Sequence, residues 1–196
     1  MPKEKIINIP NFLSFYRIVL FPFVLWLSLN GEEKYFAIFL CINLITDILD
    51  GFIARTFNLK TEFGARLDSI ADVGTYILAF VGILKFKLEQ FNDTIWMLWL
   101  LLILFILSNM LSIIKFRKFP SLHLYSMKVG GYAQGIFFFV LFAWQFNQSL
   151  YVVAMILGYI SFSEEIVVLL LLKNMKSNAK GLFWVLKKYK MDSRHE

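Results

Sequence analysis

Long apolar stretches separated by short polar turns dominate the pattern of hydrophobic and polar positions along this chain. A helix needs about 20 mostly apolar residues to cross a bilayer. Six stretches are long enough, and clusters of charged and turn-forming residues separate them. The pattern therefore predicts six membrane-spanning helices, at roughly residues 12–29, 35–55, 64–84, 94–114, 125–144 and 150–172.

The composition agrees with an all-α integral membrane protein. Hydrophobic residues make up 59% of the 196 residues, whereas a soluble domain is usually about 45–50% apolar. We predict a six-span catalytic membrane domain over residues 1–175 and a basic cytoplasmic tail over residues 176–196. The apolar, lysine-bearing stretch 181–190 suits a helix on the membrane surface as well as it suits a disordered tail.

The distribution of charge predicts the orientation of the helices. The formal net charge is +6, and the basic residues lie mainly at the ends of the apolar stretches. If both termini are cytoplasmic, the only basic residues on outer turns are Lys34, Lys85 and Lys87. The positive-inside rule then places both termini in the cytoplasm, and we expect a bacterial inner membrane. Basic residues at span ends indicate anionic lipids as their partner, and we expect no nucleic acid.

Four aspartates interrupt the apolar pattern in the run D-x2-D-G-x2-A-R-x8-G-x3-D-x3-D, over residues 47–72. A carboxylate in hydrocarbon costs a few kcal/mol or more unless it meets a cation or water. At about 100° per residue, Asp47 and Asp50 share one face of the second span, and Asp68 and Asp72 share one face of the third. The short linker makes these spans antiparallel neighbours, so we expect the carboxylates to face each other in the cytoplasmic half of the membrane.

Carboxylate oxygens without a nearby His or Cys favour hard cations such as Mg²⁺ or Mn²⁺. One or two such ions would neutralise the aspartates and hold a pyrophosphate. Two other interpretations stay open: aspartates that pair only with Lys or Arg for structure, and a proton or cation pathway. Glu164 and Glu165, in the sixth span, point about 100° apart, so both cannot easily face one site.

Three further residues of the run suit a phosphate-bearing ligand. Gly51 and Gly64 leave room where a nucleotide or a neighbouring backbone approaches closely, although Gly51 also suits tight helix packing. Arg55 offers a forked donor for phosphate oxygens.

The run resembles the signature of the CDP-alcohol phosphotransferase family, and every specified position matches. The resemblance implies a six-span bundle with a cytosolic site, usually in a homodimer. It also implies transfer of a phosphoalcohol from a CDP-linked donor to an alcohol, with release of CMP. The implied metal ligands are Asp47, Asp50, Asp68 and Asp72, and the implied general base is Asp72. The residues implied around the CDP moiety are Gly51, Arg55 and Gly64.

The acceptor is indicated by weaker signals. The N-terminal stretch NIPNFLSFYR, residues 8–17, is similar to the same segment of phosphatidylglycerophosphate synthases and related cardiolipin synthases. It suits a helix entry with an interfacial arginine equally well. Arg117 and Lys128 are candidates for an acceptor phosphate, with ordinary loop charge as their alternative. Ile114-Lys-Phe-Arg117 stands where those synthases carry an Arg-Glu pair.

We therefore expect an enzyme of phospholipid biosynthesis that transfers a phosphatidyl group from CDP-diacylglycerol to an alcohol, with glycerol 3-phosphate as the preferred acceptor. Inositol phosphate and phosphatidylglycerol remain alternative acceptors. A cation-coupled membrane transporter that uses the same carboxylates is the alternative from another class.

Overall fold

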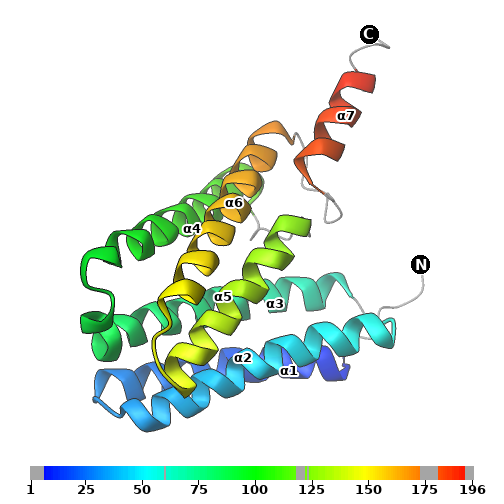
Figure 1. Cartoon of the computed structure of the whole chain (residues 1–196). Helices are drawn as coiled ribbons and strands as arrows, with labels where there is room; N and C mark the ends of the chain where they lie inside the picture. The colour runs from blue at the N-terminus through cyan, green and yellow to red at the C-terminus, as the bar shows by residue number, and fades with distance from the viewer. Residues whose placement is uncertain (1–6, 60, 118–121, 123, 173–180, 193–196) are drawn as a thin grey trace. The chain divides into compact units, whose positions relative to one another are not determined.

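The computed structural model describes residues 7–59, 61–117, 122, 124–172 and 181–192, and every regular element among them is helical (Figure 1). The α-helices are α1 (Ile9–Leu29), α2 (Glu33–Thr56), α3 (Glu62–Gly82), α4 (Ile95–Phe116), α5 (Tyr125–Ala143), α6 (Gln148–Leu171) and α7 (Leu182–Asp192). Three short segments join α3 to α4, namely η1 (Ile83–Lys87), η2 (Leu88–Gln90) and η3 (Asn92–Thr94).

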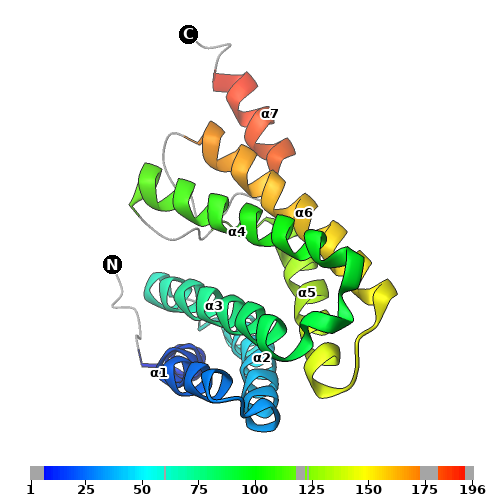
Figure 2. The same ribbon diagram turned by 90° about the vertical axis from the view of Figure 1, so that its left-hand side faces the viewer.

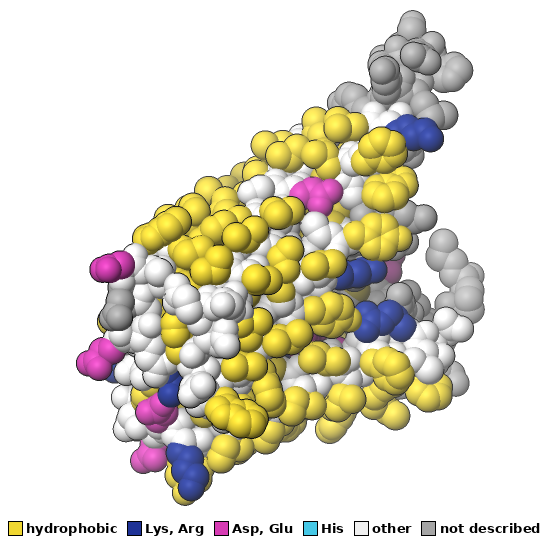
Figure 3. Space-filling view, viewed as in Figure 1, with side chains coloured by type: hydrophobic (Ala, Val, Ile, Leu, Met, Phe, Trp, Pro, Cys, Tyr) yellow, Lys and Arg dark blue, Asp and Glu magenta, His cyan; other side chains and the backbone are white. Residues whose placement is uncertain are grey.

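Six of the helices, α1 to α6, are long and apolar enough to cross a membrane. Their bounds agree with the predicted spans to within a few residues, so the prediction of a six-span, all-α membrane protein is confirmed. Large apolar side chains on these helices face outward, for example Trp26, Ile38, Ile103 and Ile160, each roughly half exposed. Hydrophobic side chains cover much of the face drawn in Figure 3. Such rows suit contact with lipid acyl chains.

The chain forms two compact units. The first comprises Met1–Asn92 and Phe138–Phe146, and the second comprises Asp93–Phe137 and Asn147–Glu196. In the first unit, α1 packs against both α2 and α3 (Figure 2). Gly82, at the end of α3, lets aromatic rings approach its backbone, since an added Cβ would lie 2.8 Å from Cζ of Phe142 and would also collide with Phe36.

The first turn of α1 follows from its sequence. The side chain of Asn8 accepts a hydrogen bond from the backbone N–H of Asn11 at 2.9 Å, which is the usual role of an N-cap residue. Pro10 lies in the first turn, where its missing N–H costs no hydrogen bond. The rest of α1 packs against both α2 and α3.

In the second unit, α4 packs against α6. Buried Ser108 of α4 donates a hydrogen bond to the buried carboxylate of Glu165. Lys115, near the end of α4, donates to the backbone oxygens of Leu169 and Leu170 at 2.9 and 2.7 Å. A cation at these carbonyls suits the negative end of the α6 dipole. The ammonium of Lys115 therefore has a structural role at the end of α6.

Part of the predicted tail is helical. The carboxylate of Glu164 accepts the backbone N–H of Leu182 at 2.7 Å, at the start of α7, where a negative charge suits the helix dipole. Leu182 and Val185 of α7 pack against a buried cluster made of Leu122, Leu124, Val168 and Leu169. Residues 176–180 and 193–196 of the tail lie outside the described residues. Placement of the tail at the membrane surface remains a prediction.

Candidate metal centre

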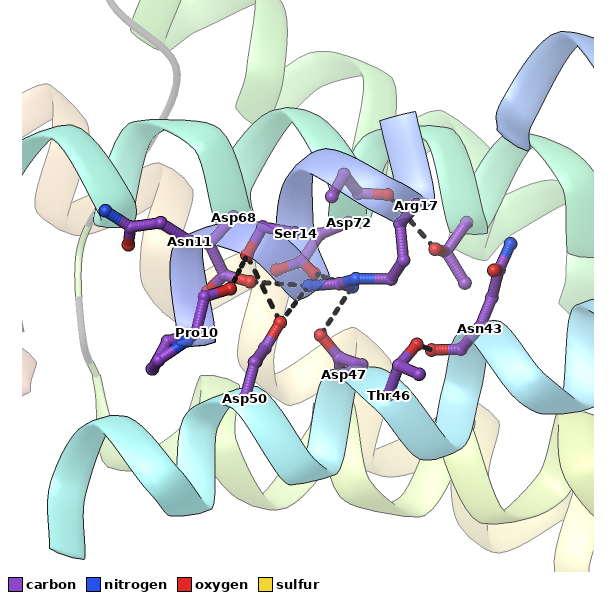
Figure 4. A network of polar contacts seen from close by, with 12 residues as sticks. Pro10, Asn11, Ser14, Arg17, Asn43, Thr46, Asp47, Asp50, Asp68 and Asp72 are labelled. Atoms are coloured by element: carbon purple, nitrogen blue, oxygen red, sulfur yellow. Dashed lines mark hydrogen bonds and ion pairs between the residues drawn. The ribbon is translucent and has the colours of Figure 1, made fainter. Parts of the chain in front are cut away.

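The two pairs of aspartates lie on adjacent helices. Asp47 and Asp50 are one turn apart on α2, and Asp68 and Asp72 are one turn apart on α3. Helix α1 packs against both, and its Arg17 reaches between the two pairs (Figure 4). The spacing in the sequence correctly predicted that the carboxylates come together. It did not indicate that an arginine lies among them.

The guanidinium of Arg17 contacts all four aspartates. Nη1 donates to Oδ1 of Asp47 at 2.6 Å and to Oδ1 of Asp72 at 3.1 Å. Nη2 donates to Oδ2 of Asp50 and to Oδ1 of Asp68, both at 2.7 Å. The side chain of Arg17 is only 1% exposed. A buried cation therefore joins one carboxylate pair of α2 to one pair of α3.

The charges in this cluster do not balance. One guanidinium faces four carboxylates, so with all four aspartates ionised the formal charges leave an excess of three negative charges. Like charges this close repel strongly where water is scarce, and a buried ion pair is stable only when its charges are well compensated. Arg17 alone therefore does not neutralise four ionised aspartates.

The four carboxylates differ in their access. The side chain of Asp50 is 5% exposed, and its Oδ2 also accepts a hydrogen bond from Ser14 at 3.2 Å. The side chains of Asp47, Asp68 and Asp72 are 42%, 40% and 46% exposed. Asp50 thus forms the buried floor of the cluster, and the other three carboxylates have an open side where an ion or a charged ligand can bind.

The geometry fits a divalent cation. Carboxylate oxygens of Asp47, Asp50 and Asp68 lie within 4.8 Å of one another. Donor sets made of carboxylate oxygens suit hard cations. The contacts of Arg17, at 2.6 to 3.1 Å, show that the same aspartates can surround a positive charge. The role of the four aspartates as ligands remains a prediction that this geometry supports.

The N-terminal stretch holds the connection between α2 and α3. The side-chain amide of Asn8 donates to the backbone oxygen of Leu59 at 3.3 Å, and that of Asn11 donates to Oγ1 of Thr61 at 3.4 Å. Thr61 caps α3 by accepting the N–H of Gly64 at 2.9 Å. These hydrogen bonds give the N-terminal stretch a structural role, because they fix the start of the helix that carries Asp68 and Asp72.

The two glycines of the run have different surroundings. A Cβ added at Gly64 would collide with Oδ1 of Asn11 and lie 2.9 Å from Oγ1 of Thr61. At Gly51 the nearest atom to an added Cβ is a guanidinium nitrogen of Arg55, at 3.6 Å, which is an ordinary contact. Packing within the chain therefore favours glycine at 64, whereas it tolerates a side chain at 51. The predicted roles of both glycines and of Arg55 around CDP remain predictions.

This contrast predicts different effects for two matched variants. Gly64→Ala should lower the thermal unfolding temperature in detergent, because overpacking costs about 1–3 kcal/mol of folding free energy. Adding Asn11→Ala should recover part of that loss, because the colliding amide is removed. Gly51→Ala should leave the unfolding temperature unchanged or slightly higher, since Ala favours a helix interior, while raising the donor KM about tenfold. Equal thermal losses in both single variants would contradict this account.

The candidates for an acceptor phosphate belong to the second unit. Arg117 follows α4 as its C-cap, with a left-handed φ of 55°, and is exposed. Lys128 of α5 is also exposed, with Nζ 5.4 Å from the centre of the Tyr125 ring. Both side chains are thus accessible on their own unit, and their part in acceptor binding remains a prediction.

The sequence pattern did not predict the central place of Arg17, or of Ser14 beside Asp50. One signal was present, because Arg17 is the only charged residue within the first predicted span, 12–29. An ionisable residue inside an apolar helix is a candidate for a functional site. The expected partners of a lone intramembrane arginine are intramembrane carboxylates, and this chain has them one and two helices further on.

Comparison with known proteins gives an independent result. A family model described as CDP-alcohol phosphatidyltransferase matches residues 7–175. Relatives from Salmonella typhimurium and Escherichia coli (strain K12), both named "CDP-diacylglycerol--glycerol-3-phosphate 3-phosphatidyltransferase", are 42% and 39% identical over 77 residues. Each match covers 38% of this chain and only 42% of the length of the relative. No solved structure matches the chain.

Proposed function

Because the chain belongs to the CDP-alcohol phosphatidyltransferase family, we propose that it transfers a phosphatidyl group from CDP-diacylglycerol to glycerol 3-phosphate and releases CMP. The observation that carries the proposal is the cluster of four carboxylates from α2 and α3 gathered around a cation. The names of the Salmonella and Escherichia coli relatives support the choice of donor and acceptor.

The residues that would hold one or two Mg²⁺ or Mn²⁺ ions are Asp47, Asp50, Asp68 and Asp72. Such ions, when bound, would neutralise the donor pyrophosphate and the charge that develops on CMP. The carboxylates suit metal binding for two reasons. Their formal negative charge exceeds the single positive charge of Arg17, and the side chains of Asp47, Asp68 and Asp72 are partly exposed.

The chain's own residues would orient the substrates and move one proton. The oxygen of the acceptor hydroxyl forms a bond to the phosphorus that carries diacylglycerol, while the pyrophosphate bond to CMP breaks. The hydroxyl proton passes to the carboxylate of Asp72, which acts as a general base. Arg55, whose guanidinium lies over Gly51, would bind phosphate oxygens of the donor. Positioning of the two substrates supplies much of the rate enhancement.

The proposal includes the setting of the enzyme. Both termini and the site would face the cytoplasm, because nearly all basic residues then lie on the inner side. The membrane would be a bacterial inner membrane, and the working form a homodimer, as the family resemblance implies. Arg117 and Lys128 would contact the acceptor phosphate.

The test is CMP release by the purified protein in detergent or lipid nanodiscs, with CDP-diacylglycerol and Mg²⁺ or Mn²⁺. The acceptors would be glycerol 3-phosphate, inositol phosphate and phosphatidylglycerol, each with and without a chelator. We expect metal-dependent release with glycerol 3-phosphate. Release with another acceptor would correct the acceptor alone. No CMP release with any acceptor, together with cation-driven transport in proteoliposomes, would replace the enzyme by a transporter.

A further inference from the structure

The guanidinium of Arg17 contacts the same aspartates that would hold a divalent cation. Its two terminal nitrogens take one oxygen from each of the four aspartates at 2.6 to 3.1 Å. Three of these residues, Asp47, Asp50 and Asp68, are those whose oxygens lie close enough together to share an ion. Two cations cannot use the same oxygen lone pairs at full strength, because they also repel each other. The guanidinium of Arg17 and a bound metal ion therefore compete for the same carboxylates.

The hydrogen bonding of Arg17 is incomplete in this position. Its Nε is buried and has no hydrogen-bond partner, although a buried donor without a partner costs about 1–3 kcal/mol. The four ion pairs offset that cost. Once another cation takes the carboxylates, little would hold the guanidinium in place. The side chain has several rotatable bonds, so displacement requires rotation of the buried head group and not movement of α1.

The four carboxylates also require a positive charge nearby when no metal is bound. Asp50 is almost fully buried, and four carboxylates without any positive charge would repel one another across the contact between α2 and α3. Arg17 comes from α1, the helix that packs against both. Each terminal nitrogen of its forked head group contacts one aspartate of α2 and one of α3, as a compact ammonium cannot.

Building on the metal-dependent function proposed above, we propose that Arg17 is a displaceable internal counter-cation of the metal centre. Its guanidinium holds the four carboxylates together until a divalent cation binds, and it then leaves those oxygens. Arg17 thus stabilises the metal-free protein and weakens metal binding. It is a positioning residue, because it acts on the carboxylates that would hold the metal.

The first experiment compares Mn²⁺ binding by wild-type protein, Arg17→Gln and Arg17→Lys, measured by electron paramagnetic resonance of free Mn²⁺. Arg17→Gln should bind Mn²⁺ about tenfold more tightly or better, which corresponds to about 1.4 kcal/mol. Arg17→Lys should fall between the two, because it keeps the charge but not the fork. In chelator, both variants should unfold at a lower temperature than the wild type, and Mn²⁺ should raise their unfolding temperature more than that of the wild type.

A second measurement separates displacement from simple repulsion by a fixed charge. In protein labelled with ¹⁵N-arginine, the side-chain signal of Arg17 is assigned as the signal missing from Arg17→Lys. Saturating Mg²⁺ should shift this signal, because the ion pairs are lost. An unchanged signal at saturating Mg²⁺ would overturn the proposal, as would equal or weaker Mn²⁺ binding by Arg17→Gln.

These results are distinct from a failure of the proposed function. If wild-type protein and both variants bind no Mn²⁺, the metal centre itself is refuted, and this inference with it. If wild-type protein binds Mn²⁺ and releases CMP, but Arg17→Gln binds no more tightly, only the role of Arg17 is refuted. Should Arg17→Gln fail to fold, the Arg17→Lys isotherm and the ¹⁵N signal still decide the question.

Discussion

Asp50→Asn is expected to abolish metal-dependent CMP release while leaving the protein folded. Asp50 is the most buried of the four aspartates and lies on the floor of the cluster, so its loss removes a charge at the centre of the proposed metal site. Bound metal supplies several kcal/mol of transition-state stabilisation, so turnover should fall about 10³-fold or more. Mn²⁺ binding should weaken by more than the roughly 10–100-fold that loss of an outer partner costs.

In chelator, the expected change in unfolding temperature for Asp50→Asn is opposite in direction to that for Arg17→Gln. Asn keeps the volume of Asp50 and can still accept the hydrogen bond from Ser14, while Arg17 keeps its other three carboxylates. One negative charge fewer reduces the repulsion within the cluster. In chelator, Asp50→Asn should therefore unfold at an equal or higher temperature than the wild type, as measured by thermal unfolding in detergent.

Glu165→Gln is the matched control for Asp50→Asn. Glu165 is also a carboxylate buried inside an apolar helix, but its partner is Ser108 in the second unit. Turnover and Mn²⁺ binding should stay close to wild type in this control. Normal CMP release by Asp50→Asn would remove Asp50 from the site, whereas loss of turnover in both variants would point to a general effect of neutralising intramembrane acids.

The sequence predicted the fold because the relevant signals are local. The length and apolarity of each stretch are sufficient to identify six spans. The i, i+3 spacing of Asp47 and Asp50, the i, i+4 spacing of Asp68 and Asp72 and the short linker predict four converging carboxylates, and the structure confirms that they meet. Each of these inferences needs only the length and apolarity of a stretch, helical periodicity and a short linker.

The place of Arg17 depends on information that periodicity does not contain. Its partners are 30 to 55 residues away in the chain, and its reach depends on how α1 is rotated against α2 and α3. The same holds for Gly64, whose need for glycine comes from the amide of Asn11 on another helix. Side-chain contacts between helices determine the role of Arg17 and the preference for glycine at 64. The sequence of one helix does not reveal these contacts.

For Glu164 and Glu165, helical geometry predicts the directions of the side chains but not their partners. About 100° between adjacent side chains predicts that the two acids face different surroundings, and the structure confirms it. Glu165 accepts a hydrogen bond from Ser108 of α4, and Glu164 caps the start of α7 through Leu182. The identity of these partners was not predictable, because both depend on tertiary packing.

Asp72→Asn is expected to lower kcat far more than donor affinity. Asp72 makes the longest of the four contacts with Arg17, at 3.1 Å, and its side chain is the most exposed of the four at 46%. It is therefore the carboxylate most available to an incoming hydroxyl. General-base catalysis contributes typically about 10²–10⁴-fold, so kcat for CMP release should fall by that factor. The KM for CDP-diacylglycerol should change by less than about threefold.

Asp72→Glu is the conservative control, because it keeps a carboxylate that can accept the proton but displaces it by one methylene. It should recover part of the lost kcat, whereas Asn at the same position should not. The measurement is steady-state CMP release with each substrate varied in turn, with saturating metal. Equal losses in kcat and in donor affinity for Asp72→Asn would assign Asp72 to metal or donor binding alone, since a group that acts only in the chemical step leaves ground-state binding intact.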